Sequence, residues 1–157
     1  MDSTLARLSV NAAFLAEMKE AHADYQECLI SLRHLCDTNC GTNRVVSECG
    51  QFLHRMRDVF ATQCELEETY GYVRVSDSKT RTSQDVEIQQ TFAQHRQISL
   101  LLMELSERFD GLQYQGTLVR EINPFLRDLR SLQALVEQHE ATERDLIRSA
   151  MSTAKKT

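Results

Sequence analysis

Apolar residues recur along this chain at alternating spacings of three and four, which is the pattern of helices that bury one face. The pattern runs through four long stretches separated by short polar segments, so it predicts four amphipathic helices. Their predicted bounds are about Thr4–Asp37, Asn43–Tyr70, Ser83–Phe109 and Asn123–Met151. Asn123 and Pro124 suit an N-cap followed by proline in the first turn, although an earlier, kinked start near Thr117 would also fit.

Four helices of this length joined by short connections favour an all-α fold, an antiparallel up-down-up-down four-helix bundle. The connections are the polar segments 37–43, 71–84 and 110–116. A chain of 157 residues fits one domain. We therefore expect a single bundle over residues 1–152, followed by a disordered tail over 153–157.

Composition and charge exclude some classes of function. Hydrophobic residues make up 41% of the chain, charged residues 26%, and the net charge is −5. No basic stripe is present, so we expect no nucleic-acid partner. The longest apolar block, ISLLLMEL at 98–105, is too short to cross a membrane, and the N-terminus does not resemble a signal peptide. The expected compartment is the cytoplasm, where the five cysteines would be reduced thiols.

Each predicted helix places polar residues on its apolar, core-facing stripe. Burying a polar group without a partner costs about 1–3 kcal/mol, and an unpaired carboxylate costs more. With antiparallel neighbours these residues fall at similar heights in one half of the bundle, so they can satisfy one another or a bound ion. The six are His22, Gln63, Glu67, His95, His139 and Glu143.

Two interpretations of this polar set stay open from the residues alone. Imidazoles and carboxylates that converge in a bundle core match the ligands of first-row transition metals such as Fe, Zn, Cu and Ni. The i, i+4 spacing of His139 and Glu143 stacks two donors on one helical face. The same residues could instead be core polar groups held by hydrogen bonds and buried salt bridges. The size of the set favours a metal site.

Four sequence blocks resemble the hemerythrin-like HHE cation-binding family, and together they span nearly the whole chain. The blocks are MKEAHADYQECL, FATQCELEETYGYV, FAQHRQISLLLMEL and FLRDLRSLQALVEQHEATERDLI. The resemblance implies a four-helix bundle with a non-haem iron centre, usually di-iron. By position, it implies imidazole ligands at His22, His95 and His139, the last of them a terminal ligand, and bridging carboxylates at Glu67 and Glu143.

One position departs from the family pattern. Members have histidine four residues before the glutamate of the second helix, where this chain has Gln63 before Glu67. An amide oxygen is a weaker donor than imidazole for a divalent transition metal. Three outcomes follow: two metals with Gln63 or water filling the gap, one metal, or none. The expected cofactor is iron, as one ion or as two that an oxo or hydroxo group could bridge, with zinc and manganese ranked below it.

The resemblance implies a protein that binds, senses or stores O2, a related small ligand or iron. No substrate pocket can be identified from the sequence, so an enzymatic role is not assigned. The alternative is a degenerate, metal-free bundle that acts as a structural or protein-interaction module. In that alternative, hydrogen bonds such as one between Gln63 and His22 would hold the polar residues. The oligomeric state is left open.

Overall fold

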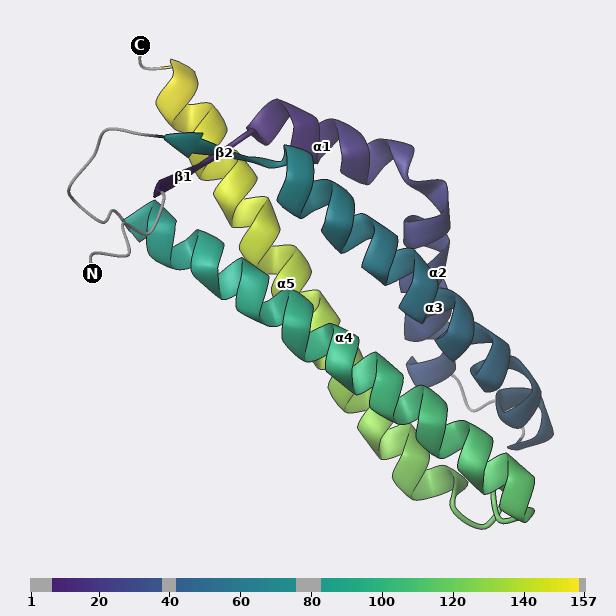
Figure 1. Ribbon diagram of the computed structural model, residues 1–157. Helices are drawn as coiled ribbons and strands as arrows, with labels where there is room; N and C mark the ends of the chain where they lie inside the picture. The colour runs from purple at the N-terminus through teal and green to yellow at the C-terminus, as the bar shows by residue number, and fades with distance from the viewer. Residues whose placement is uncertain (1–6, 38–41, 76–82, 156–157) are drawn as a thin grey trace, which may run out of the picture.

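The computed structural model describes residues 7–37, 42–75 and 83–155, and nearly all of them are helical (Figure 1). This part of the chain forms five helices and two short strands, which confirms the all-α class. The helices are α1 (Ala12–Ala21), α2 (Ala23–Asp37), α3 (Thr42–Tyr70), α4 (Ser83–Gln115) and α5 (Ile122–Lys155). The strands are β1 (Arg7–Val10) and β2 (Tyr72–Val75), which pair in antiparallel fashion.

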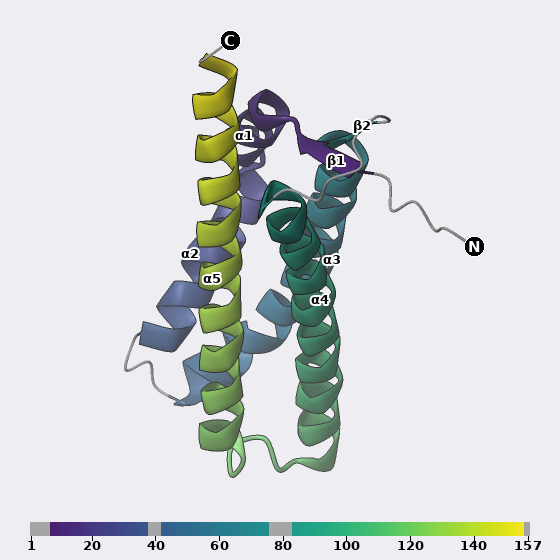
Figure 2. The ribbon, with the colours of Figure 1, turned by 90° about the vertical axis from the view of Figure 1, so that its left-hand side faces the viewer.

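The long helices pack side by side as a helical bundle (Figures 1 and 2). Helix α4 contacts α3 and α5, α2 contacts the same two helices, and α1 lies against α5. The strand pair lies at the end of the bundle where α5 finishes, and the turn between α4 and α5 lies at the opposite end. The strand pair therefore ties the beginning of the described chain to the segment that follows α3.

The first predicted helix is wrong at its start. Arg7–Val10 is a strand, helix α1 begins only at Ala12, and Thr4 lies outside the described residues. Leu8 and Val10 alternate with a serine and both pack on the apolar cluster at this end of the bundle, which is the period of two that a strand requires. The Asn11 side chain then caps α1 by accepting a hydrogen bond from the Phe14 amide at 3.3 Å.

The predicted helix is also interrupted at His22, which separates α1 from α2. The backbone of His22 has φ −85° and ψ 78°, outside the helical region. The Gln26 side-chain amide donates to the Lys19 carbonyl at 2.8 Å, so a side chain enters the hydrogen-bond ladder at the break. No glycine or proline lies between 19 and 26, so the sequence carries no conventional breaker here.

The remaining helix bounds lie closer to the prediction. Helix α4 continues through the segment expected to end it and stops before Gly116, whose φ of 70° fits a left-handed helix terminus. Helix α5 begins at Ile122, one residue before the predicted cap. It continues to Lys155, so 153–155 are helical, whereas 156–157 lie outside the described residues.

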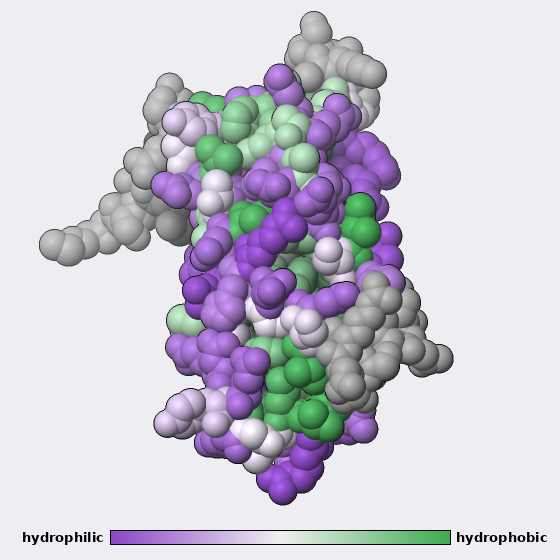
Figure 3. All heavy atoms as spheres, turned by 90° about the vertical axis from the view of Figure 1, so that its right-hand side faces the viewer, coloured by the Kyte–Doolittle hydropathy of each residue, from purple (hydrophilic) through white to green (hydrophobic). Residues whose placement is uncertain are grey.

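The surface carries polar side chains over most of the face drawn in Figure 3, with smaller apolar areas between them. Within residues 7–37, 42–75 and 83–155, none of the helices combines the length and the apolar character that crossing a membrane requires.

Candidate metal centre

A layer of buried polar residues separates two apolar clusters of the core. The larger cluster includes Phe60 and Val136, whereas the smaller one includes Ile88 and Leu146 and lies at the strand end. Between these levels, five polar side chains are at most 3% exposed. They are Gln63, Glu67, His95, His139 and Glu143.

Four of these side chains converge from three helices. Glu67 comes from α3, His95 from α4, and His139 and Glu143 from α5. One donor atom from each lies within 4.8 Å of the other three, and all four residues are buried. The i, i+4 spacing on α5 brings the last two onto one helical face, as the sequence predicted. Two imidazoles and two carboxylates at this separation could hold a metal ion.

The donor atoms of these four side chains lie close together, but several of them do not have the alignment of hydrogen bonds. His95 Nε2 lies 2.9 Å from Glu67 Oε2 and 3.7 Å from Glu143 Oε1, and His139 Nε2 pairs closely with Glu143 Oε1. Yet His95 Nε2, Glu67 Oε2 and both Glu143 oxygens have no aligned hydrogen-bond partner among the described residues. Buried polar atoms rarely stay unsatisfied, so His95 Nε2, Glu67 Oε2 and Glu143 Oε1 could be satisfied by a bound ion, whereas Glu143 Oε2 lies beside the Lys19 ammonium.

Gln94 orients the ring of His139. The Nδ1–H of His139 donates to Gln94 Oε1 at 3.0 Å, and the other ring nitrogen, Nε2, is directed at the carboxylates. The Gln94 amide nitrogen in turn donates to the Thr142 hydroxyl at 3.3 Å. Metal-binding histidines usually have such an outer partner, because it fixes the tautomer and raises the basicity of the ring.

His95 has a different environment. Burial lowers the pKa of its imidazole, but contacts with Cys64, Glu143 and Glu67 outweigh burial and raise it to about 12. Without a metal, His95 is therefore a cation between two carboxylates. The Phe60 ring stands edge-on at 6.1 Å, and the centroid of the His139 ring lies 4.6 Å away. These packed rings keep bulk water from the centre.

Lys19, from α1, contacts the other sides of the two carboxylates. Its ammonium lies 3.3 Å from Glu143 Oε2, 4.0 Å from Glu67 Oε1 and 2.8 Å from Glu140 Oε2. Burial lowers the Lys19 pKa, but these carboxylates outweigh burial and raise it above its usual range. Burial alone would raise the pKa of Glu143, yet His139, His95 and Lys19 hold it well below its usual range.

The pKa of Glu67 is shifted in the opposite direction to that of Glu143. Burial and the nearby Glu143 charge raise the Glu67 pKa, and its contacts with His95 and Lys19 only partly offset that rise. Two adjacent buried carboxylates share the available positive charge unequally, so Glu143 is the one that stays ionised most firmly.

His22 and Gln63, the other two predicted ligands, lie beside the four-donor group and pair with each other. His22 Nδ1 donates to Gln63 Oε1, and Gln63 Nε2 donates to Glu67 Oε1 at 2.9 Å. His22 does not belong to the group whose donors lie within 4.8 Å of one another, and the Gln63 oxygen is engaged by His22. The hydrogen bond expected for the metal-free alternative is thus present.

Sequence reasoning missed Lys19, Gln94 and Glu140. Lys19 is four residues after Leu15 and three before His22, so it flanks the stripe on which those residues lie. Gln94 and Glu140 each neighbour a predicted histidine. Helical spacing could have marked all three as residues close to the core, but not which partner each would contact.

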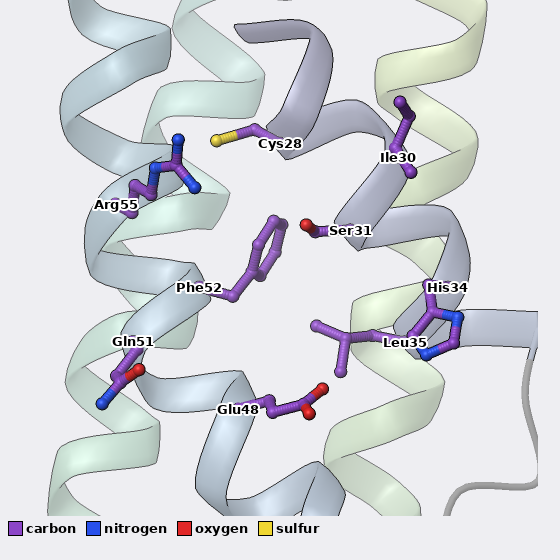
Figure 4. Close-up of a pocket in the computed structure, with 9 residues that line it drawn as sticks. All are labelled: Cys28, Ile30, Ser31, His34, Leu35, Glu48, Gln51, Phe52 and Arg55. Carbon is purple, nitrogen blue, oxygen red and sulfur yellow. The ribbon is translucent and has the colours of Figure 1, made fainter. Parts of the chain in front are cut away.

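A surface groove lies elsewhere, between α2 and α3. It has a volume of about 400 Å³ and is lined by Cys28, Ser31, Phe52 and Arg55, among others (Figure 4). No donor of the four-residue group lines it.

No family profile, curated protein or solved structure matches this chain. The resemblance to the hemerythrin-like family therefore stays a prediction from its motifs.

Proposed function

We propose that this chain is a hemerythrin-like, up-down-up-down four-helix bundle that binds a transition-metal ion, iron first among the candidates. The ion would serve to bind, sense or store O2, a related small ligand or iron itself. The observation that carries the proposal is the buried convergence of Glu67, His95, His139 and Glu143, with donor atoms within 4.8 Å of one another.

The donor set fits such an ion in chemistry as well as in position. A mixed set of imidazole nitrogens and carboxylate oxygens can bind Fe(II), Zn(II) and Mn(II), and iron ranks first because of the resemblance to the hemerythrin-like family. Glu67 Oε2 and Glu143 Oε1, the oxygens on the imidazole side, lack aligned hydrogen-bond partners among the described residues, and a bound cation would satisfy both. The order of contacts supports the bundle topology, since α2 packs on α3, α3 on α4 and α4 on α5.

The protein's own residues would prepare the centre before an ion arrives. Gln94 holds the tautomer of His139, and Phe60 packs against both histidine rings at 6.1 and 6.2 Å. A bound ferrous ion would supply an open coordination position for a small ligand such as O2. The apolar surroundings would keep competing water away from that position.

The second candidate function, a metal-free structural or protein-interaction bundle, is favoured by Lys19. Its ammonium already provides a positive charge next to Glu143 and Glu67, at 3.3 and 4.0 Å. Protonated His95 would supply a second charge, so the polar layer could persist without metal as a network of buried ion pairs. Such networks occur in protein cores when their charges balance.

Anaerobic reconstitution separates the two candidates. The purified protein is incubated with Fe(II), freed of unbound ions, and analysed for bound iron per chain. We expect at least one ion in the wild type and less than a tenth of that in Glu143→Gln, which keeps the side-chain volume but loses the charge. The matched control is Glu137→Gln, because Glu137 is exposed on the same helix.

The same measurement with Zn(II) and Mn(II) identifies the preferred ion. If the wild type retains none of the three while its far-UV circular dichroism shows an intact helical fold, the metal proposal is wrong. The metal-free bundle then becomes the better account of the polar layer.

A further inference from the structure

The carboxylates of Glu67 and Glu143 each divide their two oxygens between two sides. Glu67 Oε2 and Glu143 Oε1 face the imidazoles of His95 and His139. Glu67 Oε1 and Glu143 Oε2 face the opposite side, toward α1. Carboxylates arranged in this way can bridge two cations, so the layer offers two cation positions.

Lys19 stands at the second of these positions. Its ammonium is 3.3 Å from Glu143 Oε2, and Glu140 holds it from behind at 2.8 Å. The Lys19 side chain is 16% exposed, so its charge is largely shielded from solvent. A divalent ion at this position would have to displace the ammonium or face its repulsion at short range.

Gln63 presents the wrong group to that position. Its amide nitrogen donates to Glu67 Oε1 at 2.9 Å, while its oxygen is occupied by the hydrogen bond from His22. The carbonyl oxygen, the only donor atom that Gln63 could give to a metal, therefore points to His22. The same hydrogen bond orients the Nδ1 face of His22 toward Gln63.

The charge balance agrees with a single ion. Glu67, Glu143 and Glu140 carry three negative charges, and Lys19 with one divalent ion carries three positive charges. A second divalent ion would leave two positive charges in excess within a buried layer, which is costly in a medium of low dielectric constant.

We infer that Lys19 and Gln63 together replace a second metal ion, so that the centre holds one transition-metal ion at Glu67, His95, His139 and Glu143. This inference rests on the proposed metal binding and adds its stoichiometry. Lys19 is then a residue that determines stoichiometry, because its ammonium is a built-in cation bridging the two carboxylates.

The test counts Fe(II) ions per folded chain by native mass spectrometry under anaerobic conditions. We expect one ion in the wild type and one in Gln63→His, because the ammonium remains in place in that variant. The double variant Lys19→Ala/Gln63→His, which gains an imidazole and loses the ammonium, should bind two. Gln90→His and Lys155→Ala are the matched controls, one an exposed glutamine and the other a lysine at the end of α5, and both should bind one.

Cobalt gives an independent readout. Two Co(II) ions that share carboxylate bridges couple magnetically, so the double variant should lose the electron paramagnetic resonance signal of isolated Co(II) that the wild type retains. If Lys19→Ala/Gln63→His fails to fold, Lys19→Met/Gln63→His keeps most of the side-chain volume and removes the charge.

The possible outcomes separate this inference from the proposed function. Two ions in the wild type or in Gln63→His, or only one in a folded double variant, would overturn the role of Lys19 while leaving metal binding intact. If the wild type binds no ion, the proposed metal-binding function is wrong, and the inferred stoichiometry is wrong as well.

Discussion

The hydrogen bond between Gln94 and His139 offers a sharp test of the centre, because it can be removed without removing a ligand. Gln94 Oε1 accepts the His139 Nδ1–H at 3.0 Å, and the two side chains are 9% and 1% exposed. Gln94→Leu replaces the amide with an apolar group of similar size. The imidazole then loses the partner that fixes its tautomer and its orientation toward Glu143.

The expected loss follows from the outer-shell position of Gln94. Removing such a partner typically weakens metal affinity by about 10–100-fold, or about 1.4–2.7 kcal/mol. The metal-free protein should also lose stability, because a buried N–H is left unsatisfied at a cost of about 1–3 kcal/mol. Burial of the added leucine offsets part of that second loss.

Competition against a chromophoric chelator measures the affinity for Zn(II), which avoids oxidation of the metal. Gln90→Leu is the control, since Gln90 is exposed on the same helix. Gln94→Glu should restore affinity to the wild-type value or above, because a carboxylate accepts the same hydrogen bond and increases the basicity of the ring. A purely structural role of Gln94 would not produce this rescue.

One result would refute the reasoning. If folded Gln94→Leu binds Zn(II) as tightly as the wild type does, Gln94 does not prepare His139 for a metal. Equal losses in Gln94→Leu and Gln94→Glu would also count against the tautomer argument, since only the first variant removes the acceptor.

Three further predictions concern pH, backbone packing and thiol chemistry. The pKa of His95 is raised to about 12 in the metal-free fold, above the usual 6.5 of the unfolded chain. Its protonation therefore stabilises the metal-free protein fully below pH ~6.5, and this contribution is lost as pH rises toward 12. Chemical denaturation in the presence of a metal chelator should show that the free energy of unfolding declines over this pH range. Zn(II) affinity should instead rise by up to about tenfold per pH unit between 6.5 and 8.5, because the metal displaces the proton of the His95 imidazolium. An affinity that does not change with pH would contradict this prediction. Gly71→Ala should lower the melting temperature by several degrees, at about 1–3 kcal/mol, because the new methyl group would lie 2.5 Å from the Glu67 carbonyl oxygen and 3.1 Å from Leu15 Cγ. Gly111→Ala, with open space around it, is the control and should not lower it. Burial raises the pKa of the Cys49 thiol to about 12, so peptide mapping after exposure to an alkylating reagent at pH 8 should find this residue modified only once the protein is unfolded.

The local pattern of the sequence was sufficient for much of the fold. The period of apolar residues predicted α3 to within one residue, since α3 is observed over Thr42–Tyr70. It was wrong for residues 7–10, which had the apolar alternation of a strand but were too few to stand out beside a long helix. Strand β1 exists because it pairs with β2, and that pairing joins segments more than sixty residues apart.

The break at His22 is a second feature that the local sequence pattern did not predict. A helix propensity summed over the segment favours continuity, because no glycine or proline lies near the break. Contacts made after folding, such as the Gln26 side chain on the Lys19 carbonyl, satisfy the backbone groups that the break releases. With α1 separated from α2, Lys19 reaches Glu143 and Glu140 on α5.

The sequence by itself identified the five predicted polar residues that are buried in the layer, because spacing within a helix fixes which side chains share a face. His139 and Glu143 are the clearest case, four residues apart on α5. Only the tertiary structure decided how the layer is divided, with Lys19 on one side of the carboxylates and the imidazoles on the other. Each residue turns a helix by about 100° and advances it by about 1.5 Å, so small differences in rotation and axial register between helices decide which side chains meet. Those differences arise from packing across the whole bundle, and no single helix encodes them.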